Sequence, residues 1–259
     1  MHEELGIEVE HAWPWLVRHF DYEHASVKLH FFRVVAWHGE AHGKENQLLE
    51  WQVPGAVRVA PLLPANGPIL RALELPPILA ISQVESLGEA VFMERMETAL
   101  LRGLRLIQIR EKTLPAAELE SVARQMVKLA HAHGARVVIN TECGLGTSVG
   151  EDGVHLPGAA LMALEARPVA GLVGASCHSA AELERAAQLG LDYVQLSPVL
   201  PTLTHPGAET LGWGGFEQLV RDYPLPVYAL GGMGLDTLDM AREKGRMASP
   251  CFAPAGVEW

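Results

Sequence analysis

The stretch RLIQIREK, residues 105–112, decides the fold and holds the most informative part of the candidate site of this 259-residue chain. It is an apolar run that leads directly into charged residues, as at the end of a buried strand. Side chains alternate along a strand, so Gln108, Arg110 and Lys112 share one face, while the isoleucines between them pack on the other. Two cations and an amide at a strand end suit an anion, above all a pyrophosphate, which arginine holds through two hydrogen bonds. The alternative interpretation is an ordinary basic exit from a strand.

Similar runs recur through the second half of the chain, from Pro77 onward. The strand-like segments are ILAIS, RLIQI, RVVIN, DGVHL, GLVGAS, DYVQLS and PVYALGG. Helix-like stretches separate them; in residues 116–134 the apolar side chains recur with a helical period, and Gly134 marks the expected end. Repeated strand and helix units predict an α/β fold of parallel strands with both faces covered. About seven such units favour a TIM-type (β/α)8 barrel over a doubly wound open sheet.

Polar residues and glycines follow several of these strands, at the end where a barrel of this type carries its chemistry. They are Asn140, Ser176, His178, Thr202, Thr204, Gly231 and Gly232. The bare N–H groups of a Gly-Gly pair ahead of a helix suit a phosphate. Because several strand ends offer such partners, the sequence predicts a site for a small phosphorylated metabolite or nucleotide.

Composition and charge exclude several other classes of protein. The formal net charge of −11 argues against a nucleic-acid duplex as a partner, because a duplex repels an acidic surface. The apolar runs are too short to span a bilayer, and no export signal is evident, so we expect a cytoplasmic protein without membrane contact. Cys143, Cys177 and Cys251 lack the spacing of a zinc site or a redox pair. The sequence leaves open whether the chain forms a homo-oligomer.

The first part of the chain has a different pattern. SVKLHFFRVVAW, residues 26–37, alternates like a half-buried strand, and LLEWQV, residues 48–53, predicts another strand after a polar loop. In residues 61–73 three prolines suggest a turn that leads into a short helix.

Six motifs of the second half carry a family resemblance. QIREK, VVIN, GEDGVHL, GASCHS, LSPVLPTLTHPG and ALGG resemble, in order and spacing, the motifs of the thiamine phosphate synthase/TenI family. The resemblance implies a barrel that binds a pyrimidine diphosphate and a thiazole phosphate and joins them with loss of pyrophosphate, using Mg²⁺. It implies the following contacts: Arg110 and Lys112 with the diphosphate, Gln108 and Asn140 nearby, Ser176 and Thr202 with the pyrimidine or diphosphate, and Gly231 and Gly232 with the thiazole phosphate.

The chain departs from the family pattern at its metal-binding positions. Thr141 and Ala160 stand where the family has aspartates, and His205 stands where it has a lysine. Magnesium at a diphosphate leaving group contributes several kcal/mol, so we expect its loss to impair the joining step severely. Two alternatives follow: a non-catalytic phosphate-binding partner, or a TenI-type thiazole tautomerase with His178 as general acid and base. A hydrogen bond from His178 to a neighbouring loop is the competing interpretation of that residue.

The N-terminal part resembles another family. HEELGI, HGEAHGKENQLLEW and LPANGPIL resemble the end of the Nudix box and later motifs of MutT-type hydrolases of oxidised guanine nucleotides. The resemblance implies Glu3, Glu4 and Glu45 as metal ligands and Asn66 as a reader of the base edge. We therefore expect a partial α+β Nudix domain in residues 1–73, truncated at its start, a linker at 74–77 and the barrel at 78–259.

The C-terminal tail does not have the alternation of a final barrel strand. It reads GRMASPCFAPAGVEW, with two prolines, and a frameshift near Gly245 is one hypothesis that explains it. We expect a barrel whose last strand is missing or distorted.

Overall fold

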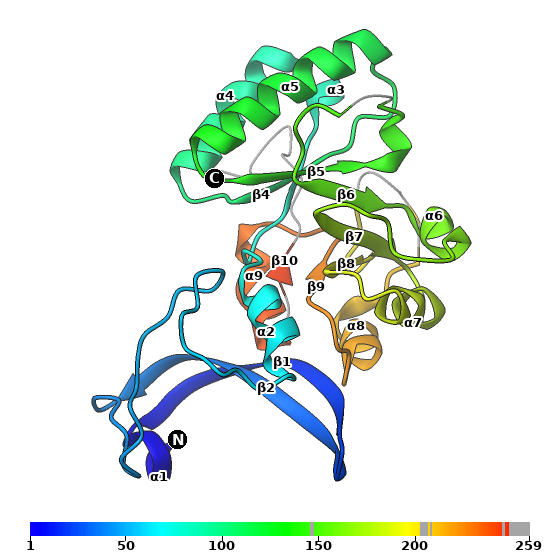
Figure 1. Cartoon of the computed structure of the whole chain (residues 1–259). Coiled ribbons are helices and arrows are strands. Elements are labelled where there is room, and N and C mark those ends of the chain that lie inside the picture. Colours follow the sequence, from blue (N-terminus) through cyan, green and yellow to red (C-terminus); the bar gives the residue numbers. More distant parts are fainter. Residues whose placement is uncertain (146–147, 203–206, 208, 245–246, 249–259) are drawn as a thin grey trace.

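A curled parallel sheet forms the larger part of the molecule (Figure 1). The computed structural model describes residues 1–145, 148–202, 207, 209–244 and 247–248. Within these ranges the sheet has the order β10-β9-β8-β7-β6-β5-β4-β3, and neighbouring strands pair in parallel. The strands are β3 (Ala80–Ile81), β4 (Leu106–Ile109), β5 (Arg136–Asn140), β6 (Gly153–Leu156), β7 (Leu172–Cys177), β8 (Tyr193–Leu196), β9 (Val227–Ala229) and β10 (Met247–Ala248). Each of the seven strand-like segments of the second half overlaps one of these strands, so that prediction is confirmed.

The sheet does not close into the full barrel that the pattern predicts. In the part of the chain that the structure describes, no ladder joins β3 to β10. Both end strands are two residues long, which leaves few backbone groups to bridge the seam between them. The prediction that the last strand is missing or distorted is wrong in part: a short last strand, β10, is present and pairs with β9 through Met247 and Ala248. The rest of the unusual tail lies outside the described residues.

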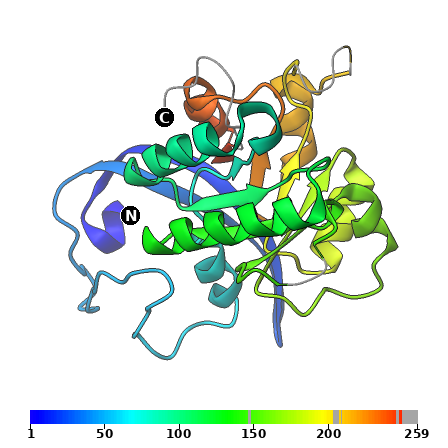
Figure 2. The same cartoon turned by 90° about the horizontal axis from the view of Figure 1, so that it is seen from above.

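Helices cover the outer face of the curled sheet (Figures 1 and 2). They are α3 (Val84–Leu87), α4 (Glu89–Leu101), α5 (Ala116–Ala132), α6 (Gly158–Ala163), α7 (Ala180–Gln188), α8 (Gly212–Val220) and α9 (Leu238–Glu243), with short 3-10 turns η1 (Thr141–Cys143) and η2 (Leu235–Thr237). The long helix predicted at 116–134 is α5, and Gly134 follows its end with a positive φ of 66°. Its buried side chains lie at the spacing read from the sequence, among them Leu119, Val122 and Met126.

Alternation along the strands divides the interior of the sheet from the helix layer. Ile107 and Ile109 pack outward with the residues of α4 and α5, as predicted. The inner face is filled at its N-terminal end by Tyr193 and Tyr228, whose rings meet edge to face at 5.4 Å. Gly174 is required beside them, because a Cβ there would lie 2.0 Å from Cζ of Tyr193. The curled sheet is therefore plugged below, and polar side chains gather at its other end.

A long hairpin lies under the N-terminal end of the sheet. Helix α1 (His2–Leu5) precedes β1 (Glu8–Tyr22), which pairs antiparallel with β2 (Ala25–His38). Strand β2 contains the predicted SVKLHFFRVVAW strand, and α2 (Asn66–Leu73) is the predicted short helix. The prediction of a strand at 48–53 was wrong: this segment has no strand, and because Leu48 is 100% and Trp51 is 83% exposed, it buries little apolar surface.

The hairpin is joined to the rest of the chain by packing and by polar contacts. Leu16, only 1% exposed, packs with Trp15 against Ile69 and Ala72 of α2. The Lys28 Nζ lies 2.7 Å from Asp222 Oδ2, just ahead of β9. The hairpin therefore covers the end of the sheet opposite the polar mouth. No helix in the described ranges is both long and apolar enough to cross a membrane.

The packing of the hairpin on α2 gives a stability prediction. We expect Leu16→Ala to lower the free energy of unfolding by about 2–5 kcal/mol, because it leaves a cavity in a closed contact. Val9→Ala on the same strand is the control, since Val9 is 41% exposed; its effect should stay within about 0.5 kcal/mol. Urea unfolding measures both. Equal effects of the two substitutions would show that the hairpin does not pack on α2.

Candidate functional site

The segment after β4 lies at the C-terminal mouth of the sheet. Gln108 is 1% exposed on the inner face, and its Oε1 is buried without a hydrogen-bond partner among the described residues. Arg110 is half-buried and close enough to His155 for its charge to affect that ring. Lys112 Nζ lies 2.8 Å from Glu142 Oε2, so its charge is shared with the segment after β5. The predicted common face of this segment places an amide and a cation at the mouth.

Two carboxylates fix the backbone of this segment to the segment after β3. Glu111, 2% exposed, accepts hydrogen bonds from the N–H groups of Val84 at 2.8 Å and Glu85 at 3.0 Å. In return, Glu85 accepts from the N–H groups of Thr113 and Leu114. Burial by itself would raise the pKa of Glu85, but these hydrogen bonds outweigh it and lower the pKa. We call this reciprocal arrangement the carboxylate clamp.

Sequence reasoning missed Glu111. It is out of phase with Gln108 and Arg110, so on a strand it must face the helix layer, where a carboxylate needs donors. The free N–H groups at the start of α3 supply them. The sequence signal that could have identified Glu111 was its charge at a strand position that faces outward.

Asn140 is the last residue of β5, next to this segment. The register pairs Ile109 with Ile139, so Arg110 and Asn140 come at the same height on neighbouring strands. Asn140 is 2% exposed, and its Oδ1 accepts from Glu142 N at 2.9 Å, which caps η1. The structure therefore brings Asn140 beside Arg110, with its amide oxygen already engaged.

A buried polar network lies below the mouth, and sequence reasoning missed its central residue. His155 on β6 is fully buried between the Tyr193 hydroxyl, 3.1 Å from Nδ1, and Ser176 Oγ, 2.9 Å from Nε2. Burial, with a smaller contribution from the charge of Arg110, lowers the pKa of His155 to about 3. The ring is therefore neutral near pH 7, with one nitrogen donating and the other accepting. The signal was its position between Val154 and Leu156, which face outward.

His178 follows β7 and is exposed at the mouth. Its Nδ1 lies 2.8 Å from the carbonyl oxygen of Ser197, and its backbone N–H donates to Glu182 at 2.6 Å. A neutral ring that donates from Nδ1 to a carbonyl keeps Nε2 as a proton acceptor. The neighbouring Cys177 is fully buried in the outer layer, as expected from alternation, and burial raises the pKa of its thiol.

The two glycines after β9 lie against the loop that follows β8. Gly231 and Gly232 have φ values of 94° and 64°, and a Cβ on Gly232 would lie 2.6 Å from the carbonyl oxygen of Pro201. Leu200 N donates to Gly231 O at 3.0 Å, which holds the two loops together. Thr202 is half-buried in the same loop. Thr204 and His205 lie outside the described residues.

The four candidate residues of the N-terminal part do not form one cluster. Glu3 and Glu4 are exposed on α1, and the segment of Glu45 is held near them, since Lys44 N donates to Glu4 O at 3.1 Å. Asn66 begins α2, which lies apart from α1 in both overall views (Figures 1 and 2). Among the described residues, no group of three or more histidine, cysteine, aspartate or glutamate side chains is arranged to hold a metal ion.

The described residues of the mouth do not fit a magnesium ion. Magnesium requires oxygen ligands, chiefly carboxylates, in near-octahedral geometry. Four carboxylates close to the mouth segments are engaged elsewhere: Glu111 and Glu85 in the carboxylate clamp, Glu142 with Lys112, and Glu182 with the backbone N–H of His178. Thr141 lies in η1 and Ala160 in α6, so neither position supplies a ligand of that kind.

The fold and the mouth together define a class: an α/β protein with a curled parallel sheet of the TIM type, whose polar side chains gather at the C-terminal strand ends. The family described as "Thiamine monophosphate synthase" matches residues 78–248, and the chain belongs to this family. The family match does not extend to residues 1–77.

Individual relatives agree with the family assignment. The chain is 33% identical to the "Putative thiamine-phosphate synthase 2" of Aquifex aeolicus, over 67% of this chain and 94% of that protein. It is 34% identical to the "Thiamine-phosphate synthase" of Thermus thermophilus, over 59% of this chain and 75% of that protein. The solved "Thiamine phosphate pyrophosphorylase from Pyrococcus furiosus" shares the fold, with a TM-score of 0.55 and 24% identity over 67% of this chain and 83% of that one.

The buried network predicts how stability depends on pH. The pKa of His155 in the folded chain, about 3, lies below the ordinary value of 6.5. The unfolded chain therefore takes up a proton that the folded chain rejects, and stability falls as the pH drops from about 6.5 toward 3. At about pH 5 the loss from His155 is about 2 kcal/mol.

His155→Gln removes this contribution, so we expect the stability difference between wild type and variant to narrow by about 2 kcal/mol between neutral pH and about pH 5. Urea unfolding at both pH values measures it, with His24→Gln as the control, because His24 is exposed. A difference that does not change with pH would contradict a neutral, buried His155.

Proposed function

We propose that the mouth of the curled sheet binds a phosphorylated thiamine precursor, the pyrimidine diphosphate or the thiazole phosphate, in a reaction of the thiamine-phosphate synthase type. One observation carries the proposal. Oε1 of Gln108 is buried without a hydrogen-bond partner in the described part of the chain, and Arg110 is the next residue along the chain on the same face. A buried acceptor without a partner is costly, and a ligand N–H group offsets that cost.

The cations suit the phosphorylated end of such a ligand. Arg110 is held in place by its backbone, since its N–H donates to Ser82 Oγ at 2.9 Å, and the carboxylate clamp fixes the following residues. A guanidinium fixed in this way binds a diphosphate through paired hydrogen bonds without loss of backbone freedom. The side chain of Lys112 is 48% exposed and forms an ion pair with Glu142. Lys112 would break this ion pair to contact the anion. Asn140, Ser176, Gly231 and Gly232 complete the proposed contacts, and Thr202 and Thr204 are proposed from the loop after β8.

The joining step distinguishes a synthase from a binding protein. The residues at the mouth do not fit the magnesium that ionises a diphosphate leaving group, so we derive no step through a metal. Incubation of the purified chain with both precursors and Mg²⁺ separates the two alternatives. Formation of thiamine phosphate rejects a binding-only role, and absence of product with retained affinity for the diphosphate rejects the synthase.

Arg110→Gln tests the proposed anion contact. We expect the affinity for the pyrimidine diphosphate to fall by about 10- to 100-fold, because a charge-assisted, bidentate contact is lost. Isothermal titration calorimetry measures the affinity. Arg124→Gln is the matched control, since Arg124 is a half-exposed arginine that pairs with Glu120 on α5. The same loss in both variants, or in neither, would refute binding at Arg110.

A second candidate function is proton transfer on a thiazole phosphate, as in a TenI-type tautomerase. The geometry of His178 favours it: the ring is anchored through Nδ1 to Ser197, and the accepting Nε2 is left to take a proton from a ligand. This reaction moves a proton between two positions of one substrate. It needs no metal and no leaving group, and the residues of the mouth are compatible with it.

His178→Gln tests this candidate. We expect the rate of thiazole tautomerisation, followed by exchange of the substrate proton for solvent deuterium, to fall by about 10²- to 10⁴-fold. The affinity for thiazole phosphate should change little. His133→Gln, a half-buried histidine at the end of α5, is the control. An unchanged rate in His178→Gln would exclude this histidine as the proton carrier.

The relationship of residues 1–73 to MutT-type hydrolases stays a prediction from resemblance. A backbone hydrogen bond from Lys44 to Glu4 brings the segment of Glu45 near α1, but among the described residues Glu3, Glu4 and Glu45 do not form a group that could hold a metal ion. The proposed domain boundaries at 73 and 78 rest on the same resemblance, and the start of the family match at residue 78 is compatible with them.

A further inference from the structure

A cavity lies at the end of the sheet opposite the mouth, between the hairpin and the open seam. Its volume is about 160 Å³. The hairpin contributes Trp13 and Trp15 from β1 and Arg33 from β2. Pro77, just ahead of β3, and Met247, at the start of β10, line it from the two edges of the seam. None of these residues belongs to the site described above.

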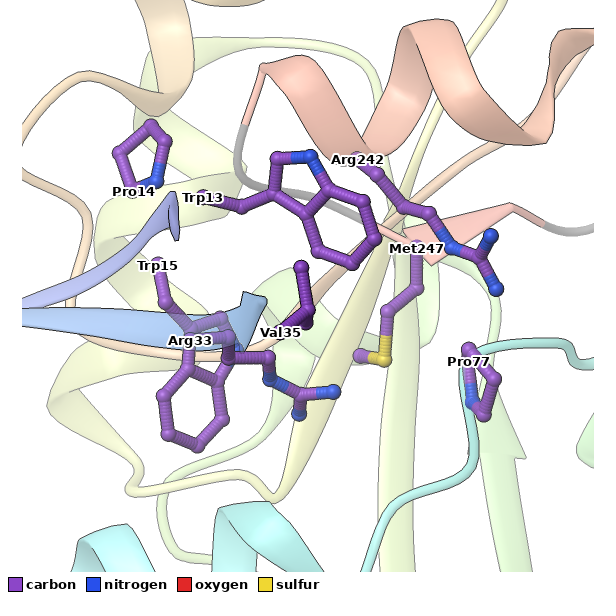
Figure 3. Close-up of a pocket in the computed structure, with 8 residues that line it drawn as sticks. All are labelled: Trp13, Pro14, Trp15, Arg33, Val35, Pro77, Arg242 and Met247. Carbon is purple, nitrogen blue, oxygen red and sulfur yellow. The ribbon is translucent and has the colours of Figure 1, made fainter. Parts of the chain in front are cut away.

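Two arginines face this cavity over aromatic rings. Figure 3 shows Arg33 with Trp15 on one side of the pocket and Arg242 with Trp13 on the other, both guanidinium groups pointing toward the side of Pro77. The Cζ of Arg33 lies 4.3 Å from the centre of the Trp15 ring, and that of Arg242 lies 5.3 Å from the Trp13 ring. The cavity therefore combines positive charge with flat apolar walls.

Arg33 lacks part of the hydrogen bonding that a buried guanidinium needs. Its Nε and Nη2 are buried and have no hydrogen-bond partner among the residues that the structure describes. Burial is the main cause that lowers the pKa of Arg33. Tyr228 raises this pKa by less, and the nearby charge of Arg242 lowers it. Arg242 forms an ion pair with Asp239, but Asp239 is 83% exposed, so this pair contributes little. An anion in the cavity would satisfy both donors of Arg33 at once.

The size of the cavity restricts the ligand. A cavity of about 150 Å³ accepts a benzene ring, and this one is of similar volume. Tryptophan faces and a methionine side chain suit an aromatic ring, and the Nε and Nη2 edge of a guanidinium matches the two oxygens of a carboxylate.

We propose that this cavity binds a small aromatic carboxylate, with the carboxylate on Arg33 and the ring between the side chains of Trp13, Trp15 and Met247. The proposal is independent of the function of the mouth. Its ligand class follows from three features together: the volume, the aromatic walls and the two buried donors without partners.

Calorimetric titration of the full chain with four probes tests the proposal. Benzoate has both the ring and the charge, benzamide has the ring without the charge, acetate has the charge without the ring, and inorganic phosphate is a different oxyanion. We expect one benzoate to bind per chain, with an affinity at least about tenfold above those for benzamide, acetate and phosphate. No binding of benzoate, or stronger binding of phosphate, would overturn the proposal.

Variants then locate the binding site. Arg33→Gln should weaken benzoate binding by about tenfold or more, because the charged donors are lost. Val35→Phe should weaken it without any change of charge, since Val35 also lines the cavity and a larger side chain fills it. Arg58→Gln, an exposed arginine in the loop after β2, is the matched control for charge.

Arg110→Gln serves to distinguish the cavity from the mouth and should leave benzoate binding unchanged. If Arg33→Gln does not fold, Val35→Phe decides alone, because it keeps both arginines. Retained binding in Val35→Phe, or loss of binding in Arg110→Gln, would place benzoate elsewhere and contradict the proposal.

Discussion

Alternation of side chains along parallel strands is the constraint on which the rest of this structure depends. Because neighbouring strands run in register, every second residue faces the helix layer, and the others share one interior. Apolar and aromatic groups fill the N-terminal half of that interior, where Tyr193 and Tyr228 meet. The C-terminal half collects Gln108, Asn140 and Ser176. A shift of one residue in any strand would exchange its inward-facing side chains with those that face the helix layer.

The carboxylate clamp explains how a mouth with cations remains ordered. Glu111 is buried, yet it accepts two backbone hydrogen bonds from the start of α3 and does not pair with the cations beside it in sequence. Arg110 is thereby left for a ligand, while the backbone on both sides of it is fixed. His155 has a related role one layer below, since its neutral ring ties Tyr193 in the interior to Ser176 at the mouth.

Much of the barrel could be predicted from sequence because its signals are local. The period of RLIQI gave the inward and outward faces of β4, and Gly134 gave the end of α5. The partners of Glu111 and His155 lie 21 to 38 positions away in sequence, so no local pattern identifies them. The same reason applies to the docking of the hairpin, where Lys28 meets Asp222 at a separation of 194 residues. LLEWQV had a strand pattern but buries little apolar surface, and the two-residue strands at the seam were too short to recognise.

The two ends of the curled sheet have different chemistry. The mouth has polar groups from several strands and suits a phosphorylated ligand, whereas the opposite end is closed by the hairpin and holds the aromatic cavity around Arg33. The hairpin lies outside residues 78–248, which match the family, and it supplies most of the cavity wall.

A crystal structure of the chain with the pyrimidine diphosphate bound would locate the ligand. We expect the diphosphate within hydrogen-bond distance of the Arg110 guanidinium, with the heterocycle against the Gln108 amide. A diphosphate bound on the outer helices or the hairpin, with the mouth holding only solvent, would contradict this expectation.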